Sequence, residues 1–290
     1  MFNLLSAIPD FVYEFYHEGF FGYSMEQDFF DWSIWHILPL LLLGLAIFLT
    51  YRYREKLASW KGEETFRFIL GFVLIFNEGF YYWRLLYVGS SHEGTQLLTY
   101  LPLQVCEWSA YLCAFMLMKK SKHMFDIAYY VCLTLGVIPF FTPAVIHYAG
   151  PSYARYYQFW IEHLVPVYAV FYMIFVHGFR ANVRRVYKPF AFLSVLAVLA
   201  IIANLNIEDA NFMYLASGTE GDSIANVLPE NIGVRLVLYL GILVVLFFLV
   251  SLPHLIPEWK ERRRQKALVG APAETPVQTD GAPLDETATE

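Results

Sequence analysis

Seven apolar segments follow one another along most of the chain, separated by short polar connections. Each has, or nearly has, the roughly 20 apolar residues that a helix needs to cross a bilayer. The polar–apolar alternation of a barrel strand is absent, and a helix satisfies its backbone hydrogen bonds within one segment. The sequence therefore predicts an all-α membrane bundle of seven transmembrane helices, at about Ile34–Tyr51, Phe66–Val88, Tyr100–Met118, Met124–Tyr148, Tyr157–Phe179, Tyr187–Ile207 and Ile232–Leu252.

Basic residues follow every second segment, which predicts the topology. Most of the 20 Lys and Arg residues come directly after the first, third, fifth and seventh segments, whereas the opposite connections hold only Arg155. Because basic loops stay in the cytoplasm, we expect the N-terminus outside and the C-terminus inside. Residues 1–33 then form an external, partly interfacial segment, 34–255 the transmembrane domain, and 256–290 a basic, then disordered, cytoplasmic tail.

Composition narrows the class of protein further. The 290 residues are 58% hydrophobic and 16% charged, with a mean hydropathy of +0.45, whereas a soluble domain carries about 25% charged residues. No large basic patch is present to bind nucleic acid. The three cysteines lie inside apolar segments, so a disulfide framework is not expected. The last segment, Ile232–Leu252, contains no Lys for a retinal Schiff base, and seven helices alone do not define a function.

Polar residues inside the apolar segments gather near their outer ends. At 1.5 Å per residue, Cys106 and His163 each lie roughly 9 Å inside the outer ends of the third and fifth segments. Arg84 and Arg235 lie about one helical turn from the outer ends of the second and seventh segments. Since polar groups in a membrane usually face the bundle interior, this pattern predicts a cavity that opens outward or into the outer leaflet.

A cysteine and a histidine at one depth indicate acyl-transfer chemistry. An imidazole can take the proton of a thiol, which then forms a thioester with an acyl group. The tetrahedral intermediate needs hydrogen-bond donors, and two arginines near the outer surface can hold a lipid phosphate. The sequence thus predicts catalytic residues Cys106 and His163, phosphate-binding residues Arg84 and Arg235, and oxyanion or support residues Gln104, Asn204, Asn211 and Tyr214.

Each of these residues also has a simpler interpretation. Cysteines in a span, such as Cys113 and Cys132, are usually small apolar packers. A histidine can hydrogen-bond between helices, arginines can extend to the headgroups, and Glu107 and Glu162 can face interfacial water or pair with those arginines. No spacing of His, Cys, Asp and Glu forms a metal-binding motif, so no metal and no cofactor is expected.

Three short stretches resemble a known family. Leu101–Cys106 resembles the Leu-Pro-x-x-x-Cys signature of bacterial YwaF-like integral membrane proteins, Trp160–His163 resembles the start of a later span, and Asn204–Leu215 resembles their Asn-rich outer loop. That family is similar to the transmembrane protein 164 acyltransferase and, more distantly, to the androgen-induced membrane hydrolases. The resemblance implies a multi-pass protein of the bacterial plasma membrane with membrane lipid as its partner. Cys106 takes the nucleophile position and His163 that of the base.

Two classes of function follow from these observations. The first is a Cys–His lipid acyltransferase or acyl hydrolase that receives lipid from the outer leaflet. The second is a transporter or a lipid- or small-molecule-binding protein without covalent chemistry. Pro139, Pro143 and Pro166 favour this class, because prolines can break helices and transporters bind their substrates at broken helices. A purely structural membrane partner is a third interpretation, and the oligomeric state is not predicted.

Overall fold

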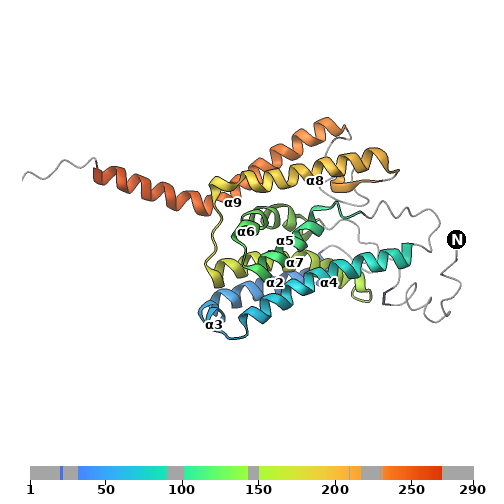
Figure 1. Cartoon of the computed structure of the whole chain (residues 1–290), viewed down its shortest axis with the longest axis horizontal. Helices are drawn as coiled ribbons and strands as arrows, with labels where there is room; N and C mark the ends of the chain where they lie inside the picture. The colour runs from blue at the N-terminus through green and yellow to red at the C-terminus, as the bar shows by residue number, and fades with distance from the viewer. Residues whose placement is uncertain are drawn as a thin grey trace, which may run out of the picture. The chain divides into compact units, whose positions relative to one another are not determined.

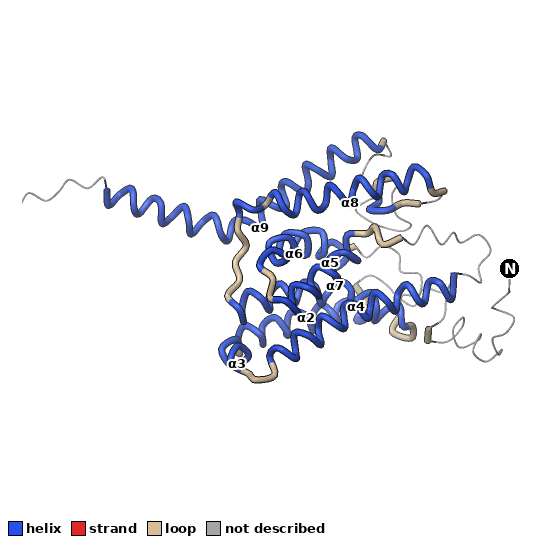
Figure 2. The backbone as a smooth tube through the Cα atoms, viewed as in Figure 1, coloured by secondary structure: helices blue, strands red, loops and turns tan. Residues whose placement is uncertain are grey.

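The described part of the chain is helical. The computed structural model describes residues 20–21, 32–89, 101–142, 150–208, 210–216, 229 and 231–269, without the side chains of 84–89 and 257–269. Within these ranges no strand occurs (Figure 2), which confirms the all-α prediction. The chain divides into two units, Met1–His254 and Leu255–Glu290, and of the second the structure describes the helical residues 255–269.

The helices follow one another along the chain in the order shown in Figure 1. They are α2 (Ile34–Arg52), α3 (Arg54–Ser59), α4 (Glu63–Gly89), α5 (Val105–Lys119), α6 (Lys122–Thr134), η3 (Leu135–Phe140), α7 (Ala154–His177), η4 (Val183–Arg185), α8 (Tyr187–Asn206), η5 (Phe212–Tyr214) and α9 (Ile232–Val269).

Five stretches are long and apolar enough to cross a membrane. They are α2, α6 with η3, α7, η4 with α8, and α9 as far as Ile256. Their apolar surfaces place the protein in lipid. The second and third predicted spans are not among them, because α5 has only 15 residues and polar residues such as Asn77 and Glu78 interrupt α4. Seven spans with an external N-terminus therefore stay a prediction.

Several helix boundaries differ from the predicted segments. The third segment becomes helical at Val105 instead of Tyr100, because Pro102 precedes the helix and Glu107 accepts the backbone N–H of Gln104 to cap it. The fourth changes into the 3-10 helix η3, which contains Pro139, and its predicted end at 143–148 lies outside the described residues. The seventh continues to Val269, and most of its residues after Pro257 are strong helix formers such as Glu, Lys, Arg and Ala.

The α7 helix is the centre of the fold, packed against α2, α4, α5 and α6 (Figure 1). Its Val170 and Met173 are fully buried among these helices. Pro166 lies inside α7 without ending it, so this proline does not break the helix.

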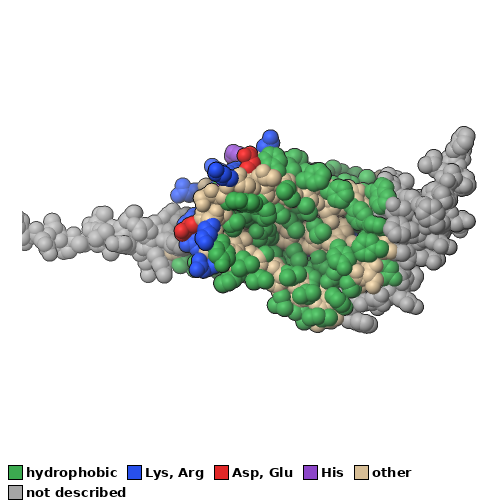
Figure 3. All heavy atoms as spheres, turned by 90° about the horizontal axis from the view of Figure 1, so that it is seen from below, with side chains coloured by type: hydrophobic (Ala, Val, Ile, Leu, Met, Phe, Trp, Pro, Cys, Tyr) green, Lys and Arg blue, Asp and Glu red, His purple; other side chains and the backbone are tan. Residues whose placement is uncertain are grey.

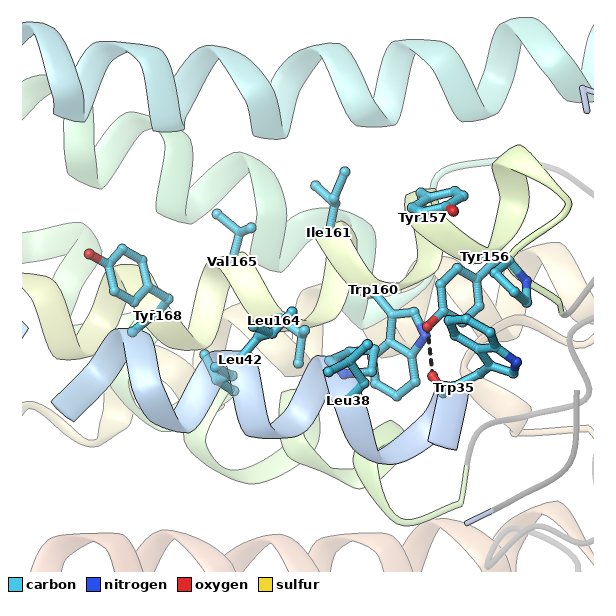
Figure 4. Close-up of a pocket in the computed structure, with 14 residues that line it drawn as sticks. Trp35, Leu38, Leu42, Tyr156, Tyr157, Trp160, Ile161, Leu164, Val165 and Tyr168 are labelled. Atoms are coloured by element: carbon cyan, nitrogen blue, oxygen red, sulfur yellow. Dashed lines mark hydrogen bonds between the residues drawn. The ribbon is translucent and has the colours of Figure 1, made fainter. Parts of the chain in front are cut away.

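A proline in α2 explains one contact between α2 and α7. Pro39 cannot donate to the carbonyl of Trp35, one turn earlier in α2. The hydroxyl of Tyr156 donates to that carbonyl instead, at 2.6 Å (Figure 4). This bond satisfies a group that would otherwise lose its partner inside an apolar environment.

Charged side chains gather at one end of a largely hydrophobic face (Figure 3). Asp126 of α6 pairs with Lys122 at 3.2 Å and with Arg185 at 3.3 Å, and the Lys122 ammonium also donates to the carbonyl of Arg180. Lys120, directly after α5, pairs with Glu63, the first residue of α4. The basic connections after the first, third and fifth predicted segments therefore meet at the same end, as the charge pattern indicated.

Glu63 is the hub of this charged end and lies ahead of the predicted second span. It is 2.7 Å from both Arg67 and His177 and accepts the hydroxyl of Tyr172 at 3.1 Å. Burial alone would raise the pKa of Glu63, but hydrogen bonds from His177 and Arg67 outweigh burial and hold this pKa below its ordinary value. Ionised Glu63 therefore stabilises the fold.

We expect Glu63→Gln to lower the free energy of unfolding by about 3 kcal/mol at neutral pH, because Arg67 stays buried without its carboxylate. The wild-type advantage is present above the unfolded-state pKa of Glu63 and is lost as pH falls through its depressed folded-state pKa. Thermal unfolding of the purified protein in detergent, measured across pH, tests this. Glu55→Gln is the control, because Glu55 is exposed and its pair with Arg54 is long. Equal losses in both variants would contradict the prediction.

Candidate functional site

The structure brings Cys106 and His163 together and adds a third residue. A ligand-type atom from each of Cys106, Glu162 and His163 lies within 4.8 Å of the other two. Cys106 is the second residue of α5, and Glu162 and His163 are consecutive in α7. Both residues of α7 are buried, while Cys106 is partly exposed. We refer to these three residues as the Cys–Glu–His cluster.

The tautomer of His163 follows from its backbone contact. Its Nδ1 lies 2.8 Å from the carbonyl oxygen of Phe159, one turn earlier in α7. Because a carbonyl can only accept, Nδ1 carries the proton. Nε2 is therefore the ring nitrogen that can take a proton or bind a cation.

Glu162 is held by groups of its own helix. Gln158 donates to its carboxylate at 2.8 Å, and Arg155 lies 3.7 Å away. The Arg155 guanidinium also stacks over the ring of Tyr81, 4.7 Å from its centre. Glu162 is 5% exposed, so it faces the protein interior, and among the described side chains the arginine it pairs with is Arg155.

Two more carboxylates lie close to the cluster. Glu107 accepts hydrogen bonds from the hydroxyl of Tyr82, at 2.8 Å, and from the backbone of Gln104, at 2.9 Å. Glu78 is fully buried and interacts electrostatically with Glu162 and Glu107. Within the described part of the chain, neither carboxylate oxygen of Glu78 has a hydrogen-bond partner, so its side chain is an unsatisfied polar group that calls for an explanation such as a functional role or a bound ion.

The predicted support residues hold the loop of residues 210–216. The side-chain amide of Asn204 both donates to the carbonyl of Phe212, at 3.1 Å, and accepts its N–H, at 2.7 Å. Gln104 accepts the N–H of Met213 at 2.9 Å, and Asn211 accepts that of Ala216 at 3.2 Å. These hydrogen bonds fix the loop against the start of α5 and the end of α8.

Arg235 also contacts this loop. Its guanidinium donates to the carbonyls of Pro229 and Tyr214, both at 2.8 Å, and the residue is 1% exposed. These contacts favour a role in positioning the loop, and phosphate binding by Arg235 stays a prediction. Arg84 lies in α4, but its side chain is outside the described part of the structure.

Tyr214 is the loop residue within electrostatic range of the cluster. Its phenol interacts electrostatically with Cys106. Met213 and Tyr214 both have positive φ, 55° and 52°, which costs of the order of 1 kcal/mol or more per residue. Burial raises the pKa of Tyr214 to about 12, so the phenol keeps its proton and can donate a hydrogen bond at physiological pH.

The sequence predicted that Cys106 and His163 lie at one depth, but it did not predict which residues surround them. Glu78, Glu162 and Arg155 were each visible in the sequence, but only the packing of α4 against α5 and α7 shows that they share one buried space. Cys113 and Cys132 lie away from the cluster, fully buried, with their sulfur atoms 3.6 Å apart.

An apolar groove of about 550 Å³ lies between α2 and α7 (Figure 4). Leu38 and Leu42 face Trp160 and Leu164 across it, and the ring of Tyr156 lies at one end of the groove. The residues of the Cys–Glu–His cluster do not line it. The groove is therefore distinct from the candidate site.

These features define a helical membrane protein with a buried cluster of cysteine, glutamate and histidine. The chain belongs to the TMEM164 family, whose sequence profile matches residues 29–252. No curated protein and no solved structure gives a significant match. The family resemblance expected from the sequence is thus confirmed, while its bacterial, YwaF-like part stays a prediction.

Proposed function

We propose that the protein is a Cys–His lipid acyltransferase or acyl hydrolase that takes phospholipid from the outer leaflet of a bacterial plasma membrane. The observation that carries this proposal is the proximity of Cys106 and His163, which belong to different helices and are 57 positions apart in the sequence. Nucleophile and base within reach of each other are the first requirement of thioester chemistry.

The reaction has two steps. Nε2 of His163 accepts the Cys106 proton while the sulfur attacks the ester carbonyl of a lipid. The carbon–oxygen ester bond breaks, and the leaving lipid alkoxide takes the proton back from His163, which leaves a thioester on Cys106. In the second step a lipid hydroxyl or water attacks the thioester, with His163 again accepting a proton, and the Cys106 thiol is restored. A lipid acceptor gives transfer, and water gives hydrolysis.

Tyr214 is the donor best placed to stabilise the oxyanion of these steps. Its phenol is near Cys106 and keeps its proton. Asn204 and Gln104 use their side chains to hold the loop that carries Tyr214, so we assign them to support. A donor fixed before the reaction stabilises developing charge without a reorganisation cost.

The second candidate function is lipid binding without covalent chemistry. The apolar groove between α2 and α7 favours it, because both helices are candidate spans and the groove offers space for an acyl chain. The two functions differ in one respect that can be measured, the reactivity of Cys106.

A lipid-like thiol-reactive probe should label Cys106 before the other two cysteines, which are fully buried. The decisive comparison is His163→Ala, which should slow labelling of Cys106 by about 10-fold or more, because no imidazole takes the thiol proton. His123→Ala is the control, since His123 is exposed and contacts Lys188. Peptide mass spectrometry reports each site. Unchanged labelling in His163→Ala would favour the binding function.

A further inference from the structure

Among the described residues, the space around Cys106 holds more acidic than basic side chains. Glu78, Glu107 and Glu162 are each at most 5% exposed. In the described part of the chain, the cation within electrostatic range of all three is Arg155. Unbalanced buried charge is costly in a medium of low dielectric constant, and bound protons or a bound cation remove that cost.

The ligand types in this space suit a particular kind of cation. A thiolate, an imidazole and a carboxylate are the usual ligands of zinc, and three protein ligands with an open fourth position are typical of zinc sites that exchange ligands. Magnesium and calcium prefer oxygen ligands alone. The three ligand atoms of the cluster are already within 4.8 Å of one another. Zinc bonds of about 2.0–2.3 Å need only a modest closure of the side chains.

Two independent features of the neighbours agree with a cation. The Nδ1–H of His163 donates a hydrogen bond to a backbone carbonyl, as metal-binding histidines usually do, which orients Nε2 as a ligand. Glu78 is fully buried, has no hydrogen-bond partner among the described residues for either carboxylate oxygen, and interacts electrostatically with Glu162 of the cluster. A carboxylate in this state is available either as a fourth ligand or as an outer partner of the cation.

We propose that Cys106, Glu162 and His163 bind a zinc-class divalent cation, with Glu78 as the neighbouring carboxylate, and that the bound cation switches acyl chemistry off. The binding half of this proposal, that the three residues bind the cation, is argued from the geometry alone. The inhibitory half, that the cation blocks acyl chemistry, rests on the proposed function. Coordination replaces the proton of Cys106, which leaves to solvent, and occupies the Nε2 lone pair of His163. The nucleophile and the base are then both blocked until the cation leaves.

The binding half is tested with the purified full-length chain in detergent, stripped by a chelator and titrated with Zn²⁺ alone, without lipid substrate. We expect a single equivalent to bind, and Co²⁺ in its place to give a thiolate-to-cobalt absorption band. Cys106→Ser should abolish the band and weaken zinc binding by more than about 100-fold, and Glu78→Gln should weaken it by about 10-fold. Cys113→Ser, which keeps the cluster, should bind as the wild type does.

A measurement on the wild-type protein tests the zinc site even if a variant does not fold. Zn²⁺, but not Mg²⁺, should protect Cys106 from alkylation, because only the former binds a thiolate well. No bound zinc, or equal zinc binding by wild type and Cys106→Ser, would overturn the site.

The inhibitory half is tested separately by thioester formation with phospholipid, with and without Zn²⁺. A thioester that forms in the presence of chelator and does not form in the presence of Zn²⁺ supports inhibition by the cation. Equal amounts of thioester under the two conditions overturn it. If no thioester forms under either condition while zinc binds, the proposed function fails and the zinc site remains.

Discussion

Cys106→Ser is expected to lower acyl transfer from phospholipid by more than about 1,000-fold. A serine hydroxyl holds its proton far more tightly than a thiol, so His163 activates it far less as a nucleophile. The measurement is the release of labelled acyl chains, or their transfer to a lysophospholipid, by purified protein in detergent and chelator.

The matched control for this variant is Cys113→Ser. Cys113 is also a cysteine of α5, two helical turns further on, but its sulfur contacts Cys132 and the carbonyl of Pro166 instead of the cluster. Cys113→Ser should keep acyl transfer close to the wild-type rate if the protein folds, since the two side chains are similar in volume. Equal rates for Cys106→Ser and wild type would exclude Cys106 as the nucleophile.

Tyr214→Phe has the second-largest expected effect, a loss of acyl transfer of about 100-fold. The change removes one hydroxyl near the reacting carbonyl, while the backbone contact of Tyr214 with Arg235 remains. The loss should be the same from pH 6 to 9, because the phenol, with a pKa of about 12, is protonated throughout. Turnover at saturating phospholipid, measured across this range, gives the result.

Tyr130→Phe separates this effect from general destabilisation. Tyr130 is a fully buried tyrosine of α6 whose hydroxyl bonds to Ser251 of α9. A similar loss of activity in both variants would mean that Tyr214 acts through stability and not through the oxyanion.

The sequence predicted where apolar segments lie more accurately than where helices begin and end. The first segment, Ile34–Tyr51, matches α2 within one residue, because lipid exposure demands an unbroken apolar run. The start of α5 was missed by five residues because local capping by Glu107 and Gln104, not hydropathy, sets it. The 3-10 helix η3 depends in the same way on the local chemistry around Pro139.

For the site, a shared depth was enough to pair Cys106 with His163. Depth along a helix can be read from residue counts, because the rise per residue is constant. Rotation of one helix toward another depends on tertiary packing, which the chain alone does not reveal. That is why the contacts of Glu162 with Arg155 and of Arg235 with the loop of Tyr214 were not predicted.

The central claim, covalent chemistry at Cys106, is tested most directly by intact-mass analysis of the purified wild-type protein after incubation with phospholipid in chelator. We predict a mass increase equal to one acyl chain, located on Cys106 by peptide analysis, removed by hydroxylamine and missing from Cys106→Ser. If the mass of the wild-type protein stays unchanged under conditions in which lipid is bound, covalent chemistry at Cys106 is contradicted. Lipid binding without covalent chemistry is then the remaining function.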